Sequence, residues 1–312
     1  MTAPGSHPSP GQVPAPRLEE VSPGIYAYLQ PDWSWSLSNT GFIVGKRGVI
    51  AVDACSTASR TQAFADAIRR VSQAPVRALV NTHHHRDHTF GNYRFPGAAI
   101  IAHEKCRQRV LELGLAPMNL PPVGNWGDLE LDPPLVTFEE RLTLWADDLR
   151  LEVLFVGPAH TSNDVVVWVP ERRVLFAGDI VFKGCTPFVL EGCIWHYFET
   201  LERLRGLGAE VIVPGHGEVC GPEALDEVEG YLRMVQERAR ELYEAGVRDP
   251  LEGARQIELG RYGEWGESER IVGNLARAFS ELRGEPPCHP IDPFWVAGLM
   301  EQYLGRPLVS KA

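Results

Sequence analysis

Short runs of apolar residues, each bounded by turn-forming residues, recur through the first two thirds of the chain and predict β-strands. The runs fall into two groups, and helical patterns follow each group. The first group spans 24–29, 40–44, 49–52, 76–80 and 98–102. The second group spans 141–145, 149–156, 164–169, 174–177 and 210–213. This arrangement favours two sheets over one continuous sheet.

Apolar residues three and four positions apart predict helices between and after these strands. The expected helices span 58–71, 104–113, 200–207, 222–245, 268–283 and 293–304. The order of elements is therefore typical of an α/β fold that ends in a helical tail. Residues 116–135, with their Pro, Gly and Asn, predict a long irregular loop of the kind that often covers a functional site.

Three segments are expected along the chain. Residues 1–17 are rich in Pro, Gly and Ser and are interpreted as a disordered lead-in. Residues 18–221 hold both groups of strands, and residues 222–312 form a helical extension. The apolar stripes of the extension need a partner surface. That surface is either the strand-rich domain or a second copy of the chain. The formation of a homo-oligomer through these helices is therefore one of two alternatives.

Composition and charge narrow the class of protein. The 312 residues are 44% hydrophobic and carry a formal net charge of −11. No apolar run approaches the roughly 18 residues of a membrane span, and no basic block is present for binding phosphates. We therefore expect no membrane and no nucleic acid as partner, and a small molecule as substrate.

Six cysteines without a C-x-x-C pair do not indicate a disulfide scaffold. The first residues also lack the pattern of a signal peptide. A cytoplasmic location is the expectation, with a signal removed earlier as the alternative.

Histidine and aspartate side chains gather directly after the predicted strands, where sheets build their sites. They are His83, His85, Asp87, His88, His160, Asp179 and His216. Neutral imidazole and carboxylate together suit zinc or a similar metal. A His-rich tract alone is often adventitious, and a single His is usually structural. The joint placement in Gly- and Pro-containing loops favours a metal site, and seven ligands are enough for two ions that share a carboxylate.

Four motifs resemble the metallo-β-lactamase fold superfamily. They are T-H-x-H-x-D-H at 82–88, G-x-x-H-T at 157–161, A-G-D at 177–179 and P-G-H-G at 214–217. The resemblance covers about residues 20–225, and the motifs are specific in combination. It implies an αββα sandwich with the metals at one edge, followed here by the helical extension.

The resemblance also implies roles for individual residues. His83, His85 and His160 would hold the first metal, and Asp87, His88 and His216 the second. Asp179 would bridge the two ions, so Asp87 and Asp179 are the expected catalytic residues, as ligands and not as free bases. Asp53 matches an acid that orients a ligand, and Asp164 is expected to support the turn after His160. His84 is expected to face away from the metals.

The implied activity is that of a dinuclear zinc hydrolase, with iron or manganese as alternative metals. A hydroxide bridging the metals would attack an ester, lactone, thioester or lactam. Glyoxalase-II-like thioesterases share the ligand set and the extension, so they stay among the alternatives. A metal-dependent cyclase or lyase, a mononuclear iron oxygenase and a non-catalytic metal-binding module are the others.

Five residues are candidates for the substrate pocket, namely Trp33, Trp35, Phe182, Lys183 and Trp195. The two tryptophans between the first two strands are either a substrate platform or a cover for the core. Lys183 is expected to anchor a carboxylate or to be an ordinary surface lysine. Because these candidates are mostly aromatic, we expect a largely apolar substrate and not a polyanion.

Overall fold

The computed structural model describes residues 15–30, 32 and 34–312. Most of the expected lead-in therefore lies outside the described residues, and so does the pocket candidate Trp33. The strand β1 (Arg17–Ser22) begins at the residue where the lead-in was expected to end.

Within the described part of the chain, seven strands form the first sheet, in the order β1-β2-β3-β4-β5-β6-β7. The strands after β1 are β2 (Ile25–Leu29), β3 (Thr40–Val44), β4 (Val49–Val52), β5 (Val76–Val80), β6 (Ala99–His103) and β7 (Val136–Phe138). Pairing is antiparallel from β1 to β4 and parallel from β4 to β7. The parallel half is the part that sends its strand ends toward the candidate site.

The second sheet contains five strands among the described residues, in the order β12-β11-β10-β9-β8. These strands are β8 (Arg141–Ala146), β9 (Leu149–Phe155), β10 (Val165–Val169), β11 (Val174–Phe182) and β12 (Val211–His216). Only the pair β11 and β12 is parallel within this sheet. These two strands carry the last two motifs.

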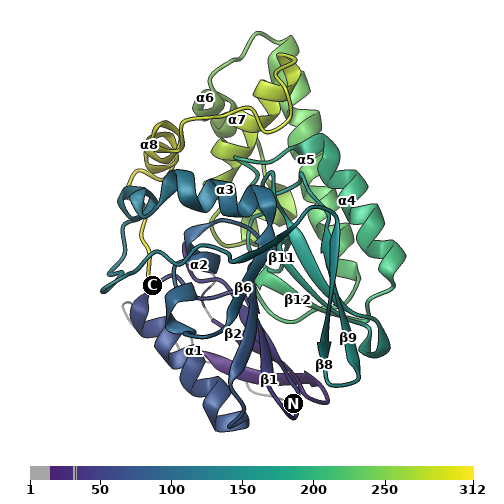
Figure 1. The fold of residues 1–312 in the computed structure, drawn as a ribbon. Helices are drawn as coiled ribbons and strands as arrows, with labels where there is room; N and C mark the ends of the chain where they lie inside the picture. Colours follow the sequence, from purple (N-terminus) through teal and green to yellow (C-terminus); the bar gives the residue numbers. More distant parts are fainter. Residues whose placement is uncertain (1–14, 31, 33) are drawn as a thin grey trace, which may run out of the picture.

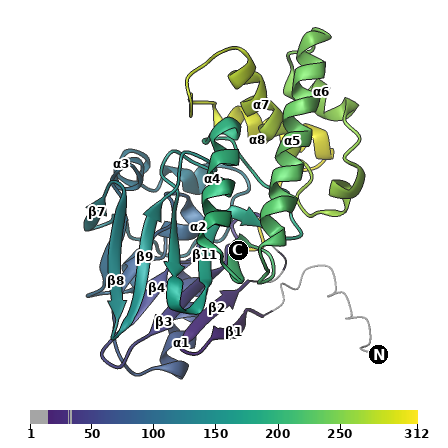
Figure 2. The same cartoon turned by 90° about the vertical axis from the view of Figure 1, so that its right-hand side faces the viewer.

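Helices cover the outer faces of the two sheets (Figures 1 and 2). Their bounds are α1 (Ala58–Val71), α2 (Arg86–Thr89), α3 (Glu104–Leu113), α4 (Ile194–Leu207), α5 (Glu223–Glu244), α6 (Pro250–Gln256), α7 (Arg270–Leu282) and α8 (Pro293–Leu304). The helix α1 packs Phe64 and Ile68 against the first sheet. The helices α4 and α5 pack Leu201 and Val228 against the second.

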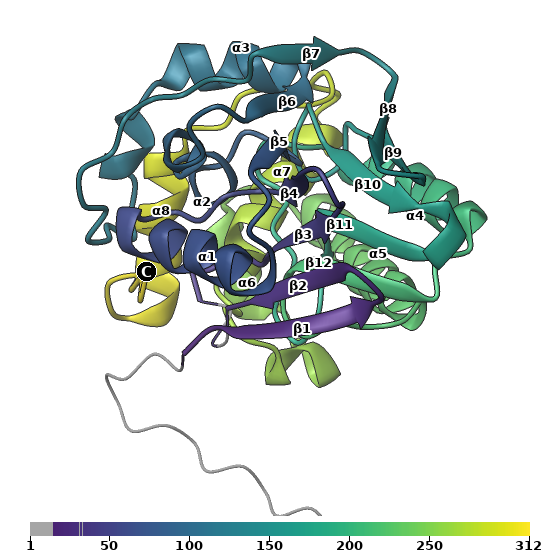
Figure 3. The same cartoon turned by 60° about the horizontal axis from the view of Figure 1, so that its bottom comes forward.

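Apolar side chains from both sheets interdigitate between them, as in stacked sheets generally. Val52 and Val80 of the first sheet belong to one buried cluster with Val153 and Phe176 of the second. Figure 3 shows the two sheets from below with α1 outside the first and α5 outside the second. The expected αββα sandwich is confirmed.

Some boundaries differ from those expected from the sequence. The strand β11 continues to Phe182 instead of ending at Ala177, because irregular pairing around Gly178 lets it stay beside β12. The helix α4 begins at Ile194 instead of Thr200. Its first turn buries Ile194 and Tyr197 but exposes Trp195, and aromatic residues on both faces hide the helical period.

The helical extension shares one buried cluster with the second sheet. Leu275 and Phe279 of α7 and Val296 of α8 belong to the same cluster as Leu175 of β11. The helices α6, α7 and α8 lie together at one end of the molecule, at the top of Figure 1. None of the described helices combines the length and the apolar character needed to cross a membrane.

The aromatic cluster under α1 generates a stability prediction. Phe64 is completely buried, and its ring centroid lies 5.1 Å from that of Tyr28 and 5.9 Å from that of Phe95. We expect Phe64→Ala to lower the free energy of unfolding by about 3–5 kcal/mol, because it leaves a cavity in a packed core. Chemical denaturation measures this change. Leu111→Ala, at a half-exposed position, is the control and should change it by about 0.5 kcal/mol or less.

Candidate metal centre

Strand ends from both sheets meet at one edge of the sandwich and carry the candidate ligands. His83 and His85 follow β5, and α2 then places Asp87 and His88 one turn further along. His160 lies in the loop after β9. Asp179 lies inside β11, and His216 ends β12. The sandwich therefore brings together residues from four separate motifs.

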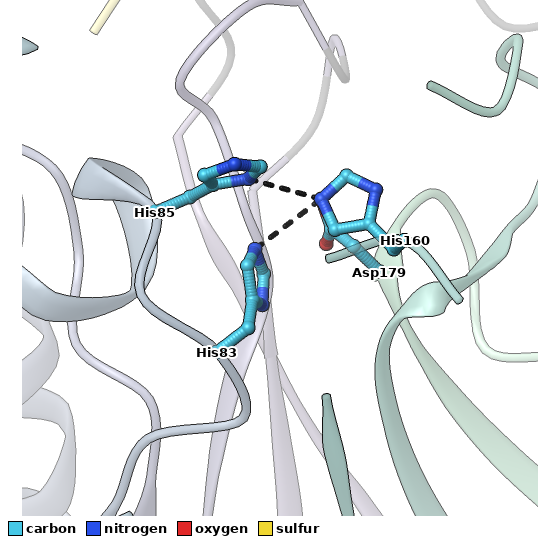
Figure 4. Close-up of side chains that lie close together, drawn as sticks. All are labelled: His83, His85, His160 and Asp179. Carbon is cyan, nitrogen blue, oxygen red and sulfur yellow. Dashed lines mark hydrogen bonds and ion pairs between the residues drawn. The ribbon is translucent and has the colours of Figure 1, made fainter. Parts of the chain in front are cut away.

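The first group of candidate ligands joins the two sheets. Among the described residues, His83, His85, His160 and Asp179 each offer a ligand atom within 4.8 Å of the others. His160 Nε2 lies 3.0 Å from His85 Nδ1 and 3.4 Å from Asp179 Oδ2. Figure 4 shows the three imidazoles and the carboxylate pointing toward a common centre.

The second group, Asp87, His88 and His216, lies directly beside the first. His216 Nε2 is 3.5 Å from Asp87 Oδ2 and 3.4 Å from Asp179 Oδ2. His88 Nε2 is 3.2 Å from Asp179 Oδ1. The carboxylate of Asp179 thus contacts histidines of both groups, which is the position expected of a bridging ligand.

Asp53 forms hydrogen bonds with two residues of the histidine motif. It is buried at the end of β4, and its Oδ2 accepts hydrogen bonds from His88 Nδ1 at 2.8 Å and Thr82 Oγ1 at 2.7 Å. Its Oδ1 accepts one from the backbone N–H of Thr82 at 2.7 Å. Such outer contacts fix the orientation of a ligating imidazole.

Asp164 supports the loop that carries His160. Its carboxylate accepts hydrogen bonds from the backbone N–H groups of Ala159 and Thr161, which flank His160. Burial raises the pKa of Asp164 to about 6, against the effect of the hydrogen bonds that it accepts from Thr161 and Ala159. His160 Nδ1 faces the carbonyl oxygen of Phe188 at 2.5 Å, so the loop and the ring are both fixed.

Burial and charge set the protonation of the centre. Burial lowers the pKa of His83 well below its usual value and that of His160 to about 3, so both rings are neutral. Burial disfavours charge on His88, but the carboxylates of Asp179 and Asp53 raise its pKa well above the usual value. Burial likewise opposes ionisation of Asp179, but His216 and His88 hold its pKa well below the usual range. The carboxylates of Asp179 and Asp53 therefore stabilise positive charge at this position.

Several buried polar atoms at the centre make no hydrogen bond within the described part of the protein. They include His83 Nε2, His88 Nε2 and Asp179 Oδ1. His88 Nε2 lies 3.2 Å from Asp179 Oδ1, and His83 Nε2 lies 4.0 Å from Asp179 Oδ2. A buried polar atom without a partner is costly. Imidazole nitrogens and carboxylate oxygens in this arrangement suit zinc or a similar first-row metal. The residues present therefore fit a metal centre.

Two glycines make room for the close packing around Asp179. A Cβ atom at Gly215 would overlap Asp179 Oδ1, and one at Gly178 would overlap the side chain of Thr82. Gly178 also has a φ of 52°, a backbone conformation that side chains other than that of glycine rarely adopt. The glycines of the A-G-D and P-G-H-G motifs are thus required by close packing.

A cavity of about 770 Å³ opens beside the centre. His85, His160 and Asp179 line its floor. One wall comes from residues 116–121 of the expected loop, and another comes from α8, through Phe294, Ala297 and Met300. The helical extension therefore contributes directly to the space in front of the candidate metals.

The pocket candidates have different positions. Trp35 and Phe182 line the cavity, and the ring of Phe182 stacks on His216 with centroids 5.3 Å apart. Trp195 does not line it, because it projects from the first turn of α4 and is 52% exposed. Lys183 does not line it either, because its Nζ binds the carboxylate of Glu227 at 2.7 Å. The expectation that Trp195 and Lys183 form the pocket is therefore wrong.

The cations at the cavity are arginines that the sequence did not single out. Within the described residues they are Arg86, Arg109 and Arg270, from α2, α3 and α7. Arg86 donates to the carbonyl oxygens of Pro117 and Leu120 at 2.7 Å, and so ties the loop to the centre. Arg86 occupies a variable position of the motif at 82–88, and Arg109 and Arg270 lie in no motif, so the sequence does not show that the three meet at the cavity.

Comparisons with known proteins place the chain in a family. The family model described as the metallo-beta-lactamase superfamily matches residues 33–216. The chain is 30% identical over 190 residues to the 2,4-dinitroanisole O-demethylase subunit alpha of Nocardioides sp. (strain JS1661), covering 58% of this chain and 54% of that protein. It is 25% identical to the linear primary-alkylsulfatase of Pseudomonas sp. (strain ATCC 19151), covering 70% of this chain and 48% of that protein. The chain thus spans about half the length of these two relatives.

Solved structures share the fold. A metallo-beta-lactamase from Pontibacter korlensis superposes with a TM-score of 0.59 at 22% identity, covering 70% of this chain and 99% of that one. The metallo-beta-lactamase IND-7 superposes with a TM-score of 0.59 at 21% identity, covering 71% of this chain and 100% of that one. The portion not covered is about 30% of this chain.

The hydrogen bonds of Asp53 generate a prediction about metal binding. Asp53→Asn offers one acceptor oxygen instead of two, so His88 and Thr82 lose part of their support. We expect metal affinity to fall by about 10- to 100-fold, the usual effect of losing such an outer partner. Competition with a chromophoric chelator measures it. Asp148→Asn, on the exposed turn between β8 and β9, should leave the affinity unchanged, and equal affinities in the two variants would contradict the role of Asp53.

Proposed function

The chain belongs to the metallo-β-lactamase superfamily, and on this basis we propose that it is a dinuclear zinc-dependent hydrolase. Its substrate would be a small, mostly apolar molecule with a cleavable ester, lactone, thioester or lactam. The observation that carries the proposal is the contact of Asp179 with both groups of candidate ligands, at 3.2 Å from His88 Nε2 and 3.4 Å from His160 Nε2.

The assignment of ligands follows the two groups. His83, His85 and His160 would hold one ion, and Asp87, His88 and His216 the other, with Asp179 between them. Two zinc ions, when bound, supply an activated water near neutral pH and positive charge for a developing oxyanion. Asp87 is a ligand in this scheme, so it is not available as a separate general base.

The protein's own residues would orient the ions and the substrate. Asp53 and the carbonyl oxygen of Phe188 fix the rings of His88 and His160. Cysteine chemistry is not needed. Burial raises the pKa of Cys185 to about 12 and that of Cys193 to about 11, so both stay protonated thiols at neutral pH.

The lining of the cavity supports an apolar substrate. Phe188, Phe294 and Met300 supply much of its wall. The guanidinium groups of Arg86 and Arg109 are already held by protein acceptors. Arg270 donates to the carbonyl oxygen of Thr186 at 2.8 Å and stacks 4.5 Å from the ring of Trp35. A substrate with several anionic groups would need more unoccupied cationic partners than these.

The relative named linear primary-alkylsulfatase supports a second candidate. An apolar cavity of about 770 Å³ has room for an alkyl chain, so a sulfate ester of a long primary alcohol is a second substrate class. This candidate uses the same metal centre and cavity but cleaves a sulfate ester instead of a carbonyl-type bond.

Two metals per chain are the first prediction of this proposal. Protein purified with zinc should contain about two ions by elemental analysis, as the two ligand groups require. His216→Ala should lose one ion and most activity. His289→Ala, at a half-exposed position outside both ligand groups, is the matched control. Well under one ion per chain would contradict the proposal, and full activity of His216→Ala together with bound iron would favour the oxygenase.

The substrate panel is the second prediction. We expect neutral aryl esters and lactones to be hydrolysed faster than a glutathione thioester or a bis-aryl phosphodiester, because the cavity has few unoccupied cations. Initial rates at equal concentration measure the preference. Faster cleavage of dodecyl sulfate would favour the second candidate, whereas preference for the thioester or the phosphodiester would contradict the expected substrate class.

A further inference from the structure

Glu191 is an acidic residue that belongs to none of the four motifs and yet reaches the metal centre. It lies in the segment between β11 and α4, and its side chain lines the cavity. Its carboxylate contacts two consecutive residues of the histidine tract. Oε2 lies 3.2 Å from His84 Nε2, and Oε1 lies 3.5 Å from His85 Nε2.

The contact with His85 is on the side of the ring opposite the candidate metals. His85 Nδ1 faces the centre, 3.0 Å from His160 Nε2. His85 Nε2 faces Glu191. A carboxylate beside Nε2 favours the tautomer that carries its proton there, which leaves the lone pair of Nδ1 free to bind a metal.

In two other histidines of the centre, one ring nitrogen likewise faces the candidate metals and the other faces an oxygen acceptor. His88 directs Nε2 toward Asp179 and Nδ1 toward Asp53. His160 directs Nε2 toward Asp179 and Nδ1 toward the carbonyl oxygen of Phe188. Ligating histidines generally give their second N–H to a carboxylate or a carbonyl oxygen. The carboxylate of Glu191 lies in the corresponding position for His85, 3.5 Å from its Nε2.

Glu191 is itself held in place from two sides. Asn163 Nδ2 donates to His84 Nδ1 at 3.0 Å, so the ring proton of His84 is on Nε2, which lies 3.2 Å from Glu191 Oε2. Arg109 Nη2 binds Glu191 Oε2 at 3.1 Å. The carboxylate of Glu191 is therefore held between His84 and Arg109.

We propose that Glu191 is a positioning residue that orients His85 as a metal ligand, with His84 and Arg109 fixing its carboxylate. The proposal rests on the two-metal centre proposed above, and it gives His84 a role. His84 lies outside both ligand groups, as expected from the sequence, but it supports the centre through Glu191 instead of only filling space.

A third metal bound by His84, His85 and Glu191 is the competing interpretation, because their ligand atoms also lie within 4.8 Å of one another. Two observations disfavour it. The guanidinium group of Arg109 is bound to the same carboxylate and would repel a cation. His85 would also have to bind metals through both ring nitrogens, which requires the loss of its second proton.

The test compares zinc affinity in the full-length wild-type protein, Glu191→Ala and Glu191→Gln. Competition with a chromophoric chelator should show an affinity for one of the two ions that is about 10- to 100-fold lower in Glu191→Ala. Glu191→Gln should lie between Glu191→Ala and the wild type, because its amide oxygen can still accept a hydrogen bond but carries no charge. Glu199→Gln, the same change on the exposed face of α4, is the matched control.

The visible spectrum of the cobalt-loaded protein adds a readout that a purely structural role would not change. We expect altered ligand-field bands in Glu191→Gln and wild-type bands in Glu199→Gln. A zinc affinity within about twofold of wild type, together with unchanged bands in Glu191→Gln, would overturn the proposal. So would a wild-type chain that binds three zinc ions and a Glu191→Gln variant that binds two. Because the readout is metal binding, a protein that binds zinc as expected but hydrolyses nothing would defeat the proposed function and leave this inference standing.

Discussion

The buried carboxylate of Asp179 is the group around which the edge of the sandwich is organised. It is 6% exposed, and the imidazoles of His88, His160 and His216 all lie within 3.4 Å of its oxygens. An ionised carboxylate in such a place is stable only with cationic or hydrogen-bonding partners. The strands that carry these partners must therefore end at one edge, and the glycines beside Asp179 must leave it room. Metal binding would compensate the charge that this arrangement concentrates.

The histidines are held from outside by a ring of acceptors with different origins. Asp53 comes from the first sheet, the carbonyl oxygen of Phe188 comes from the segment after β11, and Glu191 follows three residues later. The segment between β11 and α4 thus contacts both His160 and His85. This segment is in turn tied to the helical extension, because Arg277 of α7 donates to the carbonyl oxygen of Leu190 at 3.0 Å. The helical extension therefore contacts the same segment that contacts the candidate metal ligands.

The extension also shapes the space in which a substrate would bind. Phe294 and Met300 of α8 face the cavity from one side, and Pro117 and Leu120 of the loop after α3 face it from another. Arg270 of α7 stacks on Trp35, which comes from the segment between β2 and β3. Segments more than two hundred residues apart in sequence thus form one wall. Substrate preference would follow from these contacts, whereas the chemistry would follow from the metal ligands.

The candidate ligands could be predicted from the sequence because each sits in a short motif next to a strand. His83, His85 and His88 lie within six residues of one another, and the glycines beside Asp179 and His216 reflect local close packing that the motif itself records. The second sheet and the strands β2 to β6 of the first were predictable for the same reason, since strand patterns depend on neighbouring residues. The strands β1 and β7 were not expected from the sequence. Trp195 and Lys183 were assigned to the pocket because they lie near Asp179 in the sequence. This assignment was wrong, because the start of α4 turns Trp195 outward and Glu227 binds Lys183. Glu191, Arg109 and Arg270 lie in no motif, and Arg86 occupies a variable position of the motif at 82–88. Their roles depend on which side chains meet across α2, α3, α7 and the segment before α4. The sequence by itself determined the metal-binding chemistry, because the candidate ligands lie in short motifs. Only the tertiary structure decided the cavity and the groups that hold the ligands from outside, because these depend on contacts between distant segments.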